Sequence, residues 1–252
     1  MRILSIDSSL GTQVAVVDAA PSAAGARALQ VLSQDEQADT RRHAESLGQM
    51  LSQALSAPEA AERPLDAVVA ATGPAPFTGL RAGLVTAGVV GRTRGVPVHG
   101  VSSLDAVARR ALDELGSHEG QAGPVVLVAT DARRREVYTA LFRANGPDDV
   151  TRLTEIIVCP PAQVAQRLAE QAPGPGGGSG GIDVVAGSGA SLYPELAEMA
   201  SYQKALAPVS GDALTQVRIA LARLERGEEL STQPLYLRHA DVQMPAARKR
   251  VR

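Results

Sequence analysis

The chain opens with RILSIDSSLGTQVAVVD at residues 2–18, a stretch whose pattern returns later in the sequence. Its first five residues form a short apolar run that predicts a buried strand ending at Asp7. Gly11 allows a turn, and residues 12–18 alternate well enough to predict a second strand. Residues 27–33 are a candidate for a third. The stretch therefore predicts a meander of three strands with an acidic residue at its first turn.

Helices and further strands follow this meander. Asp39 and Thr40 are suitable N-caps for a helix whose apolar residues recur at helical spacing. A loop rich in Gly and Pro at 72–78 then leads into a helix of small residues. The sequence predicts a helix over 43–56, a strand over 65–71, a helix over 79–94, a strand over 96–101 and a helix from Ser102 or Ser103 through Leu115.

The same order begins again after residue 123. An apolar strand over 124–130 ends at Asp131, which occupies the place that Asp7 has in the first half. The sequence then predicts strands over 136–143 and 151–158, a helix over 161–171, a strand over 182–186, and helices over 191–199 and 212–226.

The order of three strands, a helix, a strand and a helix thus occurs twice. This duplication predicts an α/β protein with two mixed sheets that face a central cleft, with helices on the remaining faces. We expect an N-terminal domain over residues 1–115, a C-terminal domain over 116–238 and a basic, disordered tail over 239–252.

Composition and charge exclude several classes of protein. The chain has 252 residues and a formal charge of −2, whereas a protein whose main body grips a phosphate backbone usually has a basic excess. Two Phe, four Tyr and no Trp argue against a base-stacking surface. The single cysteine, Cys159, excludes disulfide frameworks and iron–sulfur clusters. Because it has no long apolar run and no signal-peptide pattern, we expect a cytoplasmic protein without membrane contact.

No residue pattern points to a metal site or a catalytic nucleophile. The histidines, His43, His99, His118 and His239, stand at no usual ligand spacing. Cys159 precedes two prolines, and nothing in the sequence directs a histidine to it. We therefore predict no catalytic residue and no metal ligand in this chain.

Three turns are suited to close approach of an anion. Asp7-Ser8-Ser9 follows the first strand, Asp131-Ala132-Arg133 is its counterpart, and Gly187-Ser188-Gly189 lies between a strand and a helix. Together they resemble the phosphate and adenosine turns of the actin, Hsp70 and sugar-kinase superfamily. Glycine and aspartate also occur in ordinary turns, so that alternative stays open. The candidate residues of a vestigial nucleotide site are Asp7, Ser8, Ser9, Asp131, Gly187 and Gly189.

Two helices are candidates for a docking surface. The helix over 79–94 is rich in small residues, which let another backbone come close, and the helix over 43–56 carries an apolar stripe. Such helices also pack inside their own domain, which is the alternative. The candidate interface residues are His43, Leu47, Met50, Leu51, Ala54, Thr78, Gly79, Arg81, Ala82, Gly83 and Thr86.

An ordered set of motifs resembles the TsaB (YeaZ) family, the small paralogues in bacterial threonylcarbamoyladenosine synthesis. The set comprises residues 4–9 (LSIDSS), 43–45 (HAE), 73–83 (GPAPFTGLRAG), 98–104 (VHGVSSL), 131–138 (DARRREVY) and 236–238 (YLR). The family loop usually reads Gly-Pro-Gly-Ser-Phe, whereas Ala75 and Pro76 stand here, which stiffens the loop.

The resemblance implies a non-catalytic subunit. TsaB-like proteins pair with the larger paralogue TsaD, which holds the metal and the transferase site, and the ATPase TsaE joins them to modify an adenosine beside the tRNA anticodon. ATP and metal are then expected on the partner subunits, with a homodimer when the chain is alone and tRNA contacted through the complex. The basic segment from Arg238 to Arg252 leaves direct tRNA contact open.

The alternative function is a phosphotransferase or ATPase of the same fold that acts alone. Asp7 or Asp131 could hold magnesium there, but the sequence offers no positioned base for phosphoryl transfer. A peptidase is a third reading, and the sequence supplies neither a nucleophile with its base nor a zinc site for it.

Overall fold

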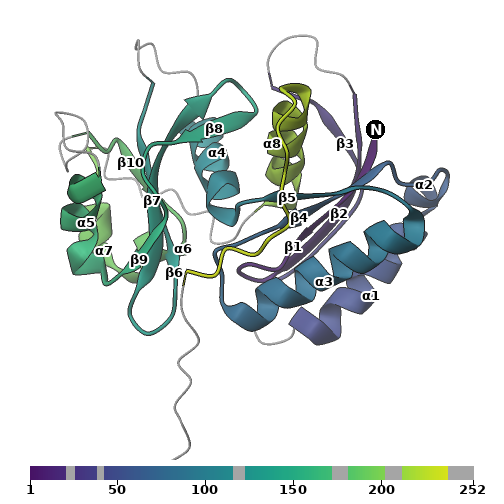
Figure 1. The fold of residues 1–252 in the computed structure, drawn as a ribbon, viewed down its shortest axis with the longest axis horizontal. Coiled ribbons are helices and arrows are strands. Elements are labelled where there is room, and N and C mark those ends of the chain that lie inside the picture. Colours follow the sequence, from purple (N-terminus) through teal and green to yellow (C-terminus); the bar gives the residue numbers. More distant parts are fainter. Residues whose placement is uncertain (21–25, 39–42, 116–122, 172–180, 202–211, 238–252) are drawn as a thin grey trace, which may run out of the picture.

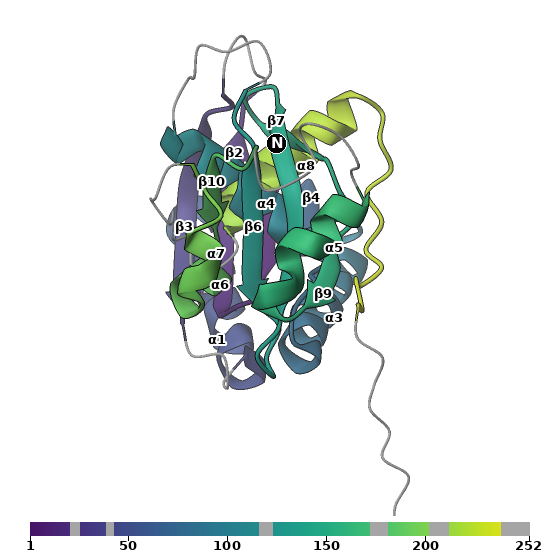
Figure 2. The ribbon, with the colours of Figure 1, turned by 90° about the vertical axis from the view of Figure 1, so that its left-hand side faces the viewer.

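The fold was analysed in a computed structural model, which describes residues 1–20, 26–38, 43–115, 123–171, 181–201 and 212–237. Two mixed sheets stand side by side, and helices cover both faces of each (Figures 1 and 2). The predicted α/β class with two mixed sheets is therefore confirmed. The tail over 239–252 lies outside the described residues.

The first sheet contains five strands in the order β3-β2-β1-β4-β5. The strands β1, β2 and β3 pair antiparallel, whereas β4 and β5 run parallel to the central strand β1. Every residue of β1 is buried, because helices cover the sheet on both sides and apolar side chains face each way. The strands are β1 (Arg2–Asp7), β2 (Thr12–Ala19), β3 (Leu29–Gln37), β4 (Ala67–Ala71) and β5 (Val98–Val101).

Three helices cover one face of the first sheet. These are α1 (His43–Ser56), α2 (Pro58–Ala61) and α3 (Phe77–Arg94), of which α1 and α3 lie side by side in Figure 1. Leu47, Met50 and Ala54 of α1 join Leu4 and Ile6 of β1 in one apolar cluster. At roughly 25 cal/mol per Å² of buried apolar surface, such clusters are the main source of stability.

The second sheet has the order β10-β6-β7-β8, with β9 also paired to β7. The single strand predicted over 151–158 is therefore two short strands, which pair with different parts of β7. The helix predicted over 191–199 is likewise two short helices, because Pro194 begins a new one. The elements are β6 (Val126–Asp131), β7 (Val137–Asn145), β8 (Asp149–Arg152), β9 (Ile157–Cys159), α5 (Val164–Gln171), β10 (Val184–Ala186), α6 (Ser188–Leu192) and α7 (Pro194–Ala197).

Two long helices cover the sheet of the opposite half of the chain. The helix α4 (Ser103–Leu115) follows β5, yet Leu104, Val107 and Ala111 pack on the second sheet. The helix α8 (Ala213–Glu225) comes from the second half, yet it packs on the first sheet. The predicted boundary after residue 115 thus separates α4 from the sheet that it covers. We call the first sheet with α1, α2, α3 and α8 the first lobe, and the second sheet with α4 to α7 the second lobe.

Candidate functional site

A pocket of about 470 Å³ opens between the two lobes. The β1–β2 turn and the start of α3 form one wall, and the end of β6 with α6 forms the other. The pocket brings together Ser9 and Asp131, as the two predicted anion turns require, and adds Thr78 and Gly79 from the predicted docking helix. The lining residues are Ser9, Leu10, Pro76, Phe77, Thr78, Gly79, Asp131, Arg133, Ser188, Ser191 and Leu192.

The carboxylate of Asp7 lies beside this pocket but is enclosed by the protein. The backbone N–H of Ser9 donates to Asp7 Oδ1 over 2.8 Å, and Gln216 Nε2 donates to Asp7 Oδ2 over 2.8 Å. Burial raises the pKa of Asp7 above its ordinary value, and the nearby Asp212 carboxylate adds to the rise. Asp7 is only 3% exposed, so its carboxylate is not placed to hold a metal ion in the pocket.

Gln216 is a site residue that the sequence did not indicate. It lies on α8 and is fully buried, 209 positions from Asp7 in the chain. Because α8 belongs to the second half of the sequence, no local pattern connects it to the first strand. Its Oε1 atom has no hydrogen-bond partner within the described part of the chain.

Ser8 holds α3 against the first sheet. Its Oγ donates to the Gly79 carbonyl over 2.8 Å, and a Cβ at position 83 would lie 2.2 Å from that Oγ. Gly79 and Gly83 therefore let the helix approach the β1–β2 turn. Ser8 has a structural partner inside the lobe and does not line the pocket.

The two predicted glycines of the adenosine turn also serve packing. A Cβ at Gly187 would lie 2.5 Å from the Ala129 carbonyl oxygen, and one at Gly189 would lie 2.8 Å from the same atom. Gly187 has φ +101°, a conformation that favours glycine. Close contact between α6 and β6 explains both residues, and neither lines the pocket.

Asp131 is the predicted turn residue whose carboxylate reaches the pocket. Its Oδ1 accepts from the backbone N–H of Arg133 over 2.8 Å, and Arg133 Nη1 lies 3.2 Å from Oδ2. The Asp131 N–H donates to Ser188 Oγ over 2.9 Å, which ties β6 to α6. The pocket thus presents a carboxylate paired with arginine, among hydroxyl and apolar side chains.

The buried positions correct part of the predicted docking surface. On α1, the side chains of Leu47, Met50 and Ala54 pack into the core of the first lobe. On α3, Gly79 and Gly83 are buried against the same lobe. The apolar residues at helical spacing on α1 are therefore core residues and not a docking surface. Leu51, Ala82 and Thr86 are half-buried, and Thr78 and Arg81 are exposed. The side chain of His43 lies outside the described residues.

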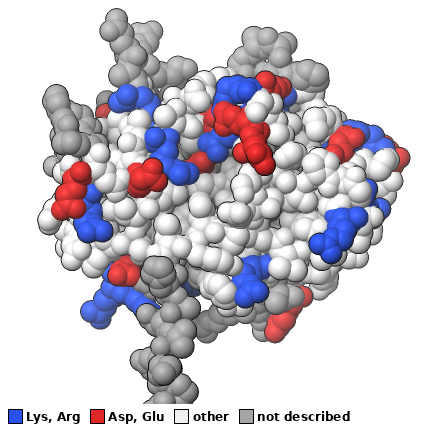
Figure 3. Space-filling model, in the orientation of Figure 1, with Lys and Arg blue, Asp and Glu red and all other residues white. Residues whose placement is uncertain are grey.

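A different row of side chains faces outward along α3. Phe77, Val85 and Val89 are 55%, 61% and 55% exposed, and with Arg81 they recur every four residues. We call these four residues the α3 stripe. Figure 3 shows the surface over α3 as mostly uncharged, between groups of basic side chains. The spacing 77, 81, 85 and 89 is present in the sequence, but a row of residues four apart on a helix does not show whether that row faces the core or the solvent.

The segment after α8 closes one end of the α3 stripe. The Gly100 N–H donates to the Leu230 carbonyl over 3.2 Å, and the Leu235 N–H donates to the Thr72 carbonyl over 2.9 Å. This extended segment then places Tyr236 against Phe77, with ring centroids 5.0 Å apart, and the Arg81 guanidinium lies 5.0 Å from the Phe77 ring. We call residues 228–237 the strap.

The structure gives little support to metal or thiol chemistry. No group of three or more His, Cys, Asp or Glu side chains gathers at one point in the described ranges. Cys159 is buried, and burial raises the pKa of its thiol, which keeps it protonated. Within the same ranges, no helix is both long and apolar enough to cross a membrane.

Comparison with known proteins identifies a family and a fold. A model of the family described as "TsaD: tRNA N6-adenosine threonylcarbamoyltransferase" matches residues 30–173, more than half of the chain. A solved structure of an uncharacterized Pseudomonas aeruginosa protein, described as similar to the peptidase YeaZ, is 25% identical with a TM-score of 0.69. The match covers 94% of this chain and 99% of that one. YeaZ from P. aeruginosa is 23% identical with a TM-score of 0.64, over 94% and 100% of the two chains.

Curated relatives are mycobacterial and uncharacterized. A Mycobacterium leprae protein is 40% identical over 140 residues, which are 56% of this chain and 36% of the relative. A Mycobacterium tuberculosis protein is 42% identical over 123 residues, which are 47% of this chain and 53% of the relative. The matched part of the chain thus spans between about a third and about half of these relatives.

Proposed function

This chain belongs to the tRNA N6-adenosine threonylcarbamoyltransferase (TsaD) family and has the fold of YeaZ (TsaB), and from that premise we propose that it is an accessory subunit in tRNA modification. In this role it binds a larger, TsaD-type paralogue and activates threonylcarbamoyl transfer by that paralogue. The observation that carries the proposal is the exposed apolar row of the α3 stripe beside a cleft whose Asp7 carboxylate is enclosed.

The cleft supports a role without catalysis of its own. Metal-assisted phosphoryl transfer needs a carboxylate that can hold the ion and a base that can reach the nucleophile. Asp7 accepts hydrogen bonds from Ser9 and Gln216, and Asp131 is paired with Arg133. Neither carboxylate therefore offers the open arrangement that a phosphotransferase requires.

The α3 stripe has the composition of a protein-binding surface. Aromatic and arginine side chains contribute most to many interfaces, and Phe77, Arg81 and the neighbouring Tyr236 form such a group next to two exposed valines. Large apolar side chains exposed in one row have few explanations other than a partner.

Charge favours a different protein over a second copy of this chain. The helix α3 carries Arg81 near its start and Arg92 and Arg94 in its last turn, and it has no acidic residue. Two antiparallel copies paired through Val85 and Val89 would bring Arg81 of one close to the arginines of the other. A partner with acidic residues around an apolar helix avoids this repulsion. We therefore propose the homodimer only as a weaker state of the isolated chain.

The remaining parts of the proposal follow from the family. A TsaE-type ATPase joins the complex, ATP and metal are held by the partner subunits, and tRNA is bound by the assembly in the cytoplasm. Two predicted interface residues are exposed and belong to the proposed contact: Arg81, which is part of the α3 stripe, and Thr78, which borders it.

Copurification with the TsaD-type paralogue from the same genome tests the docking surface. The variant Val85→Asp/Val89→Asp should lose the complex and the stimulation of tRNA modification, because it buries two carboxylates against an apolar partner. Val31→Asp is the matched control, since Val31 is also an exposed valine, at 41%, but lies on β3. Unchanged binding by the double variant would contradict the proposed surface.

The alternative of a phosphotransferase rests on the pocket and its Asp131. Its test is hydrolysis of ATP by the isolated chain. Steady turnover that Asp131→Asn abolishes would favour this alternative over the accessory role.

A further inference from the structure

Three arginines in and directly after α8 connect the two lobes. Arg218 and Arg223 belong to α8, which covers the first sheet, and Arg226 is its C-cap. In the second lobe their ion-pair partners are Asp105 and Asp113 on α4, Asp148 in the turn between β7 and β8, and Asp149 at the start of β8. Each of these arginines therefore spans the boundary between the lobes.

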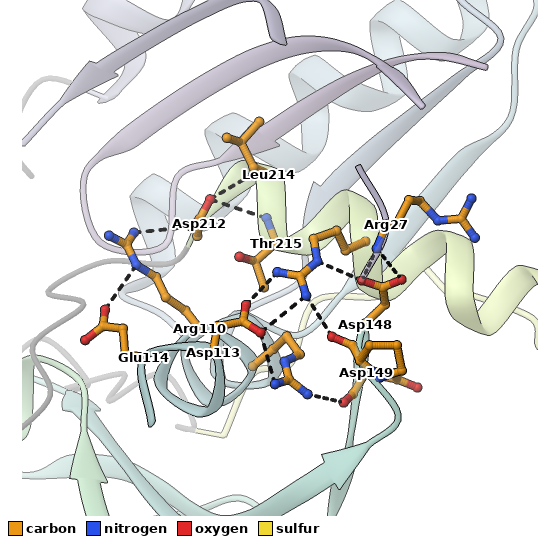
Figure 4. Close-up of polar contacts among 12 residues, drawn as sticks. Arg27, Arg110, Asp113, Glu114, Asp148, Asp149, Asp212, Leu214 and Thr215 are labelled. Atoms are coloured by element: carbon orange, nitrogen blue, oxygen red, sulfur yellow. Dashed lines mark hydrogen bonds and ion pairs between the residues drawn. The ribbon is translucent and has the colours of Figure 1, made fainter. Parts of the chain in front are cut away.

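Arg218 binds both elements of the second lobe at once. Its Nη1 lies 2.5 Å from Asp113 Oδ2 on α4, and its Nε lies 2.9 Å from Asp148 Oδ1 (Figure 4). Its Nη2 also donates to the Pro147 carbonyl over 2.7 Å. The backbone N–H of Arg27, from the first lobe, donates to both carboxylate oxygens of Asp148.

Arg223 and Arg226 bind carboxylates that are almost fully buried. Arg223 Nη2 lies 2.9 Å from Asp105 Oδ2 and 2.8 Å from Asp149 Oδ1, and Arg226 also pairs with Asp149. The side chains of Asp105 and Asp149 are 3% and 1% exposed. A carboxylate in such a place needs its cation, because an unpaired charge away from water is strongly unfavourable.

A rotation of one lobe against the other would break several of these pairs together. Isolated surface ion pairs contribute little, but this network shares partners, and its carboxylates Asp105, Asp148 and Asp149 are at most 7% exposed, which favours one geometry. The network joins α8 to α4 and to the β7–β8 turn, whereas the pocket is lined by residues of the β1–β2 turn, α3, β6 and α6.

We infer that Arg218, Arg223 and Arg226 with Asp105, Asp113, Asp148 and Asp149 form a clamp that fixes the angle between the lobes. The clamp prevents the hinge movement by which cleft enzymes close around a substrate. The pocket consequently keeps one width, and this property holds whether or not a partner binds the α3 stripe.

The distance between two spin labels, one on each lobe, tests the clamp. Suitable label sites in the full chain are Gln34→Cys on β3 and Ala169→Cys on α5, which are both exposed, with Cys159→Ala so that no other thiol reacts. An excess of unlabelled protein removes distances between copies. We expect one narrow distance distribution for the clamped protein.

The variant Arg218→Met/Arg223→Met should broaden this distribution and shift its mean. Each of the four carboxylates keeps a partner in it, namely Arg152 for Asp105, Arg109 for Asp113, the Arg27 N–H for Asp148 and Arg226 for Asp149. Arg63→Met is the matched control, because Arg63 also makes two ion pairs, to Asp18 and Asp66, but within the first lobe. It should leave the distribution unchanged.

Two results would overturn the inference. One is a broad distribution in the protein with an intact clamp, and the other is an unchanged narrow distribution in the double variant with a native circular dichroism spectrum. If that variant does not fold, Asp148→Asn replaces it, because this change removes the charge that Arg218 and Arg27 share, and the same two criteria apply.

Discussion

Gln216 on α8 donates a hydrogen bond of 2.8 Å to the carboxylate of Asp7 at the end of β1. The contact joins the last long helix of the chain to its first strand. The resemblance of the Asp7 turn to the phosphate turns of the actin, Hsp70 and sugar-kinase superfamily predicts that this acidic residue faces a ligand. Here a protein amide occupies one of its carboxylate oxygens. The accessory role proposed above depends on this contact, in which the Gln216 amide takes the place of a ligand at the Asp7 carboxylate.

Replacement of Asp7 by Asn should stabilise the protein at neutral pH. The pKa of Asp7 is raised in the folded state, so the folded protein binds its proton more tightly than the unfolded chain does. Stability from this group is therefore present at low pH and is lost as the pH rises through the raised pKa. Asp7→Asn removes that loss. When the Gln216 amide turns over, its Oε1, which has no partner among the described residues, accepts a hydrogen bond from the new amide.

Thermal unfolding across a range of pH measures this effect. The difference in Tm between Asp7→Asn and the parent should grow as the pH rises, up to a few degrees for about 1 kcal/mol. Asp131→Asn is the control, since Asp131 reaches the pocket and its side chain is 17% exposed. A Tm difference for Asp7→Asn that shrinks with rising pH would falsify the assignment of a raised pKa.

Replacement of Gly83 by Ala should destabilise the protein by about 1–3 kcal/mol, as overpacking in a core does. The added Cβ would lie 2.2 Å from Ser8 Oγ and 3.1 Å from its Cβ. Gly88→Ala on the same helix is the matched control, because nothing lies within 4 Å of its added Cβ. It should stabilise by up to about 1 kcal/mol through helix propensity.

Urea denaturation of the two variants distinguishes crowding from propensity. Addition of Ser8→Ala to Gly83→Ala should recover part of the loss, because the crowded hydroxyl is gone. Equal stability of Gly83→Ala and Gly88→Ala would show that the helix does not approach the turn as closely as the structure indicates.

The helices and strands of this fold could be predicted from the sequence better than the packing of the helices on the two sheets. The helix predicted over 43–56 agrees with α1, and the helix predicted from Ser102 or Ser103 through Leu115 agrees with α4, because both have a clear apolar period. The apolar period of a helix does not show which of the two sheets its apolar face packs against. The exchange of α4 and α8 between the lobes was therefore missed, and with it the contact of Gln216 with Asp7.

The predicted docking residues show why an apolar stripe is ambiguous. Leu47 and Met50 are apolar at helical spacing because they belong to the core, whereas Val85 and Val89 lie among polar and small residues and form no conspicuous run. Only the packing of α3 on its sheet decides which of its faces remains outside. The sequence pointed to both α1 and α3, whereas the exposed apolar row lies on α3, and its exposed side chains could not be predicted.

The strap depends on the absence of a side chain at Gly100. An added Cβ there would lie 2.1 Å from the Ser231 carbonyl oxygen and 2.6 Å from Thr72 Cγ2. Gly100→Ala should therefore push the strap from β5 and weaken the contact between Tyr236 and Phe77. Hydrogen exchange should become faster at the amides of Gly100 and Leu235, whose acceptors lie across this contact. Gly48→Ala has open space around its Cβ and should leave both rates unchanged.

An ion pair at the start of the first sheet gives the opposite pH dependence from Asp7. Arg2 is 3% exposed, and its Nη2 lies 2.8 Å from Asp18 Oδ2, with a further hydrogen bond from Nη1 to the Ala60 carbonyl. The hydrogen bond and charge of Arg2, together with Arg63, hold the pKa of Asp18 below its ordinary value. The stability from Asp18 is therefore present above its unfolded pKa of about 3.9 and is lost as the pH falls through the lowered value.

Asp18→Asn should accordingly reduce stability at neutral pH, because it leaves the buried guanidinium of Arg2 without its anion. The difference in Tm between this variant and the parent should shrink as the pH falls and vanish once Asp18 is protonated in both states. Asp7 and Asp18 belong to neighbouring strands of one sheet. Because the pKa of Asp7 is raised and that of Asp18 is lowered, Asp7→Asn and Asp18→Asn should give Tm differences of opposite sign at neutral pH. Tm differences of the same sign would contradict the direction of the pKa shift assigned to one of the two carboxylates.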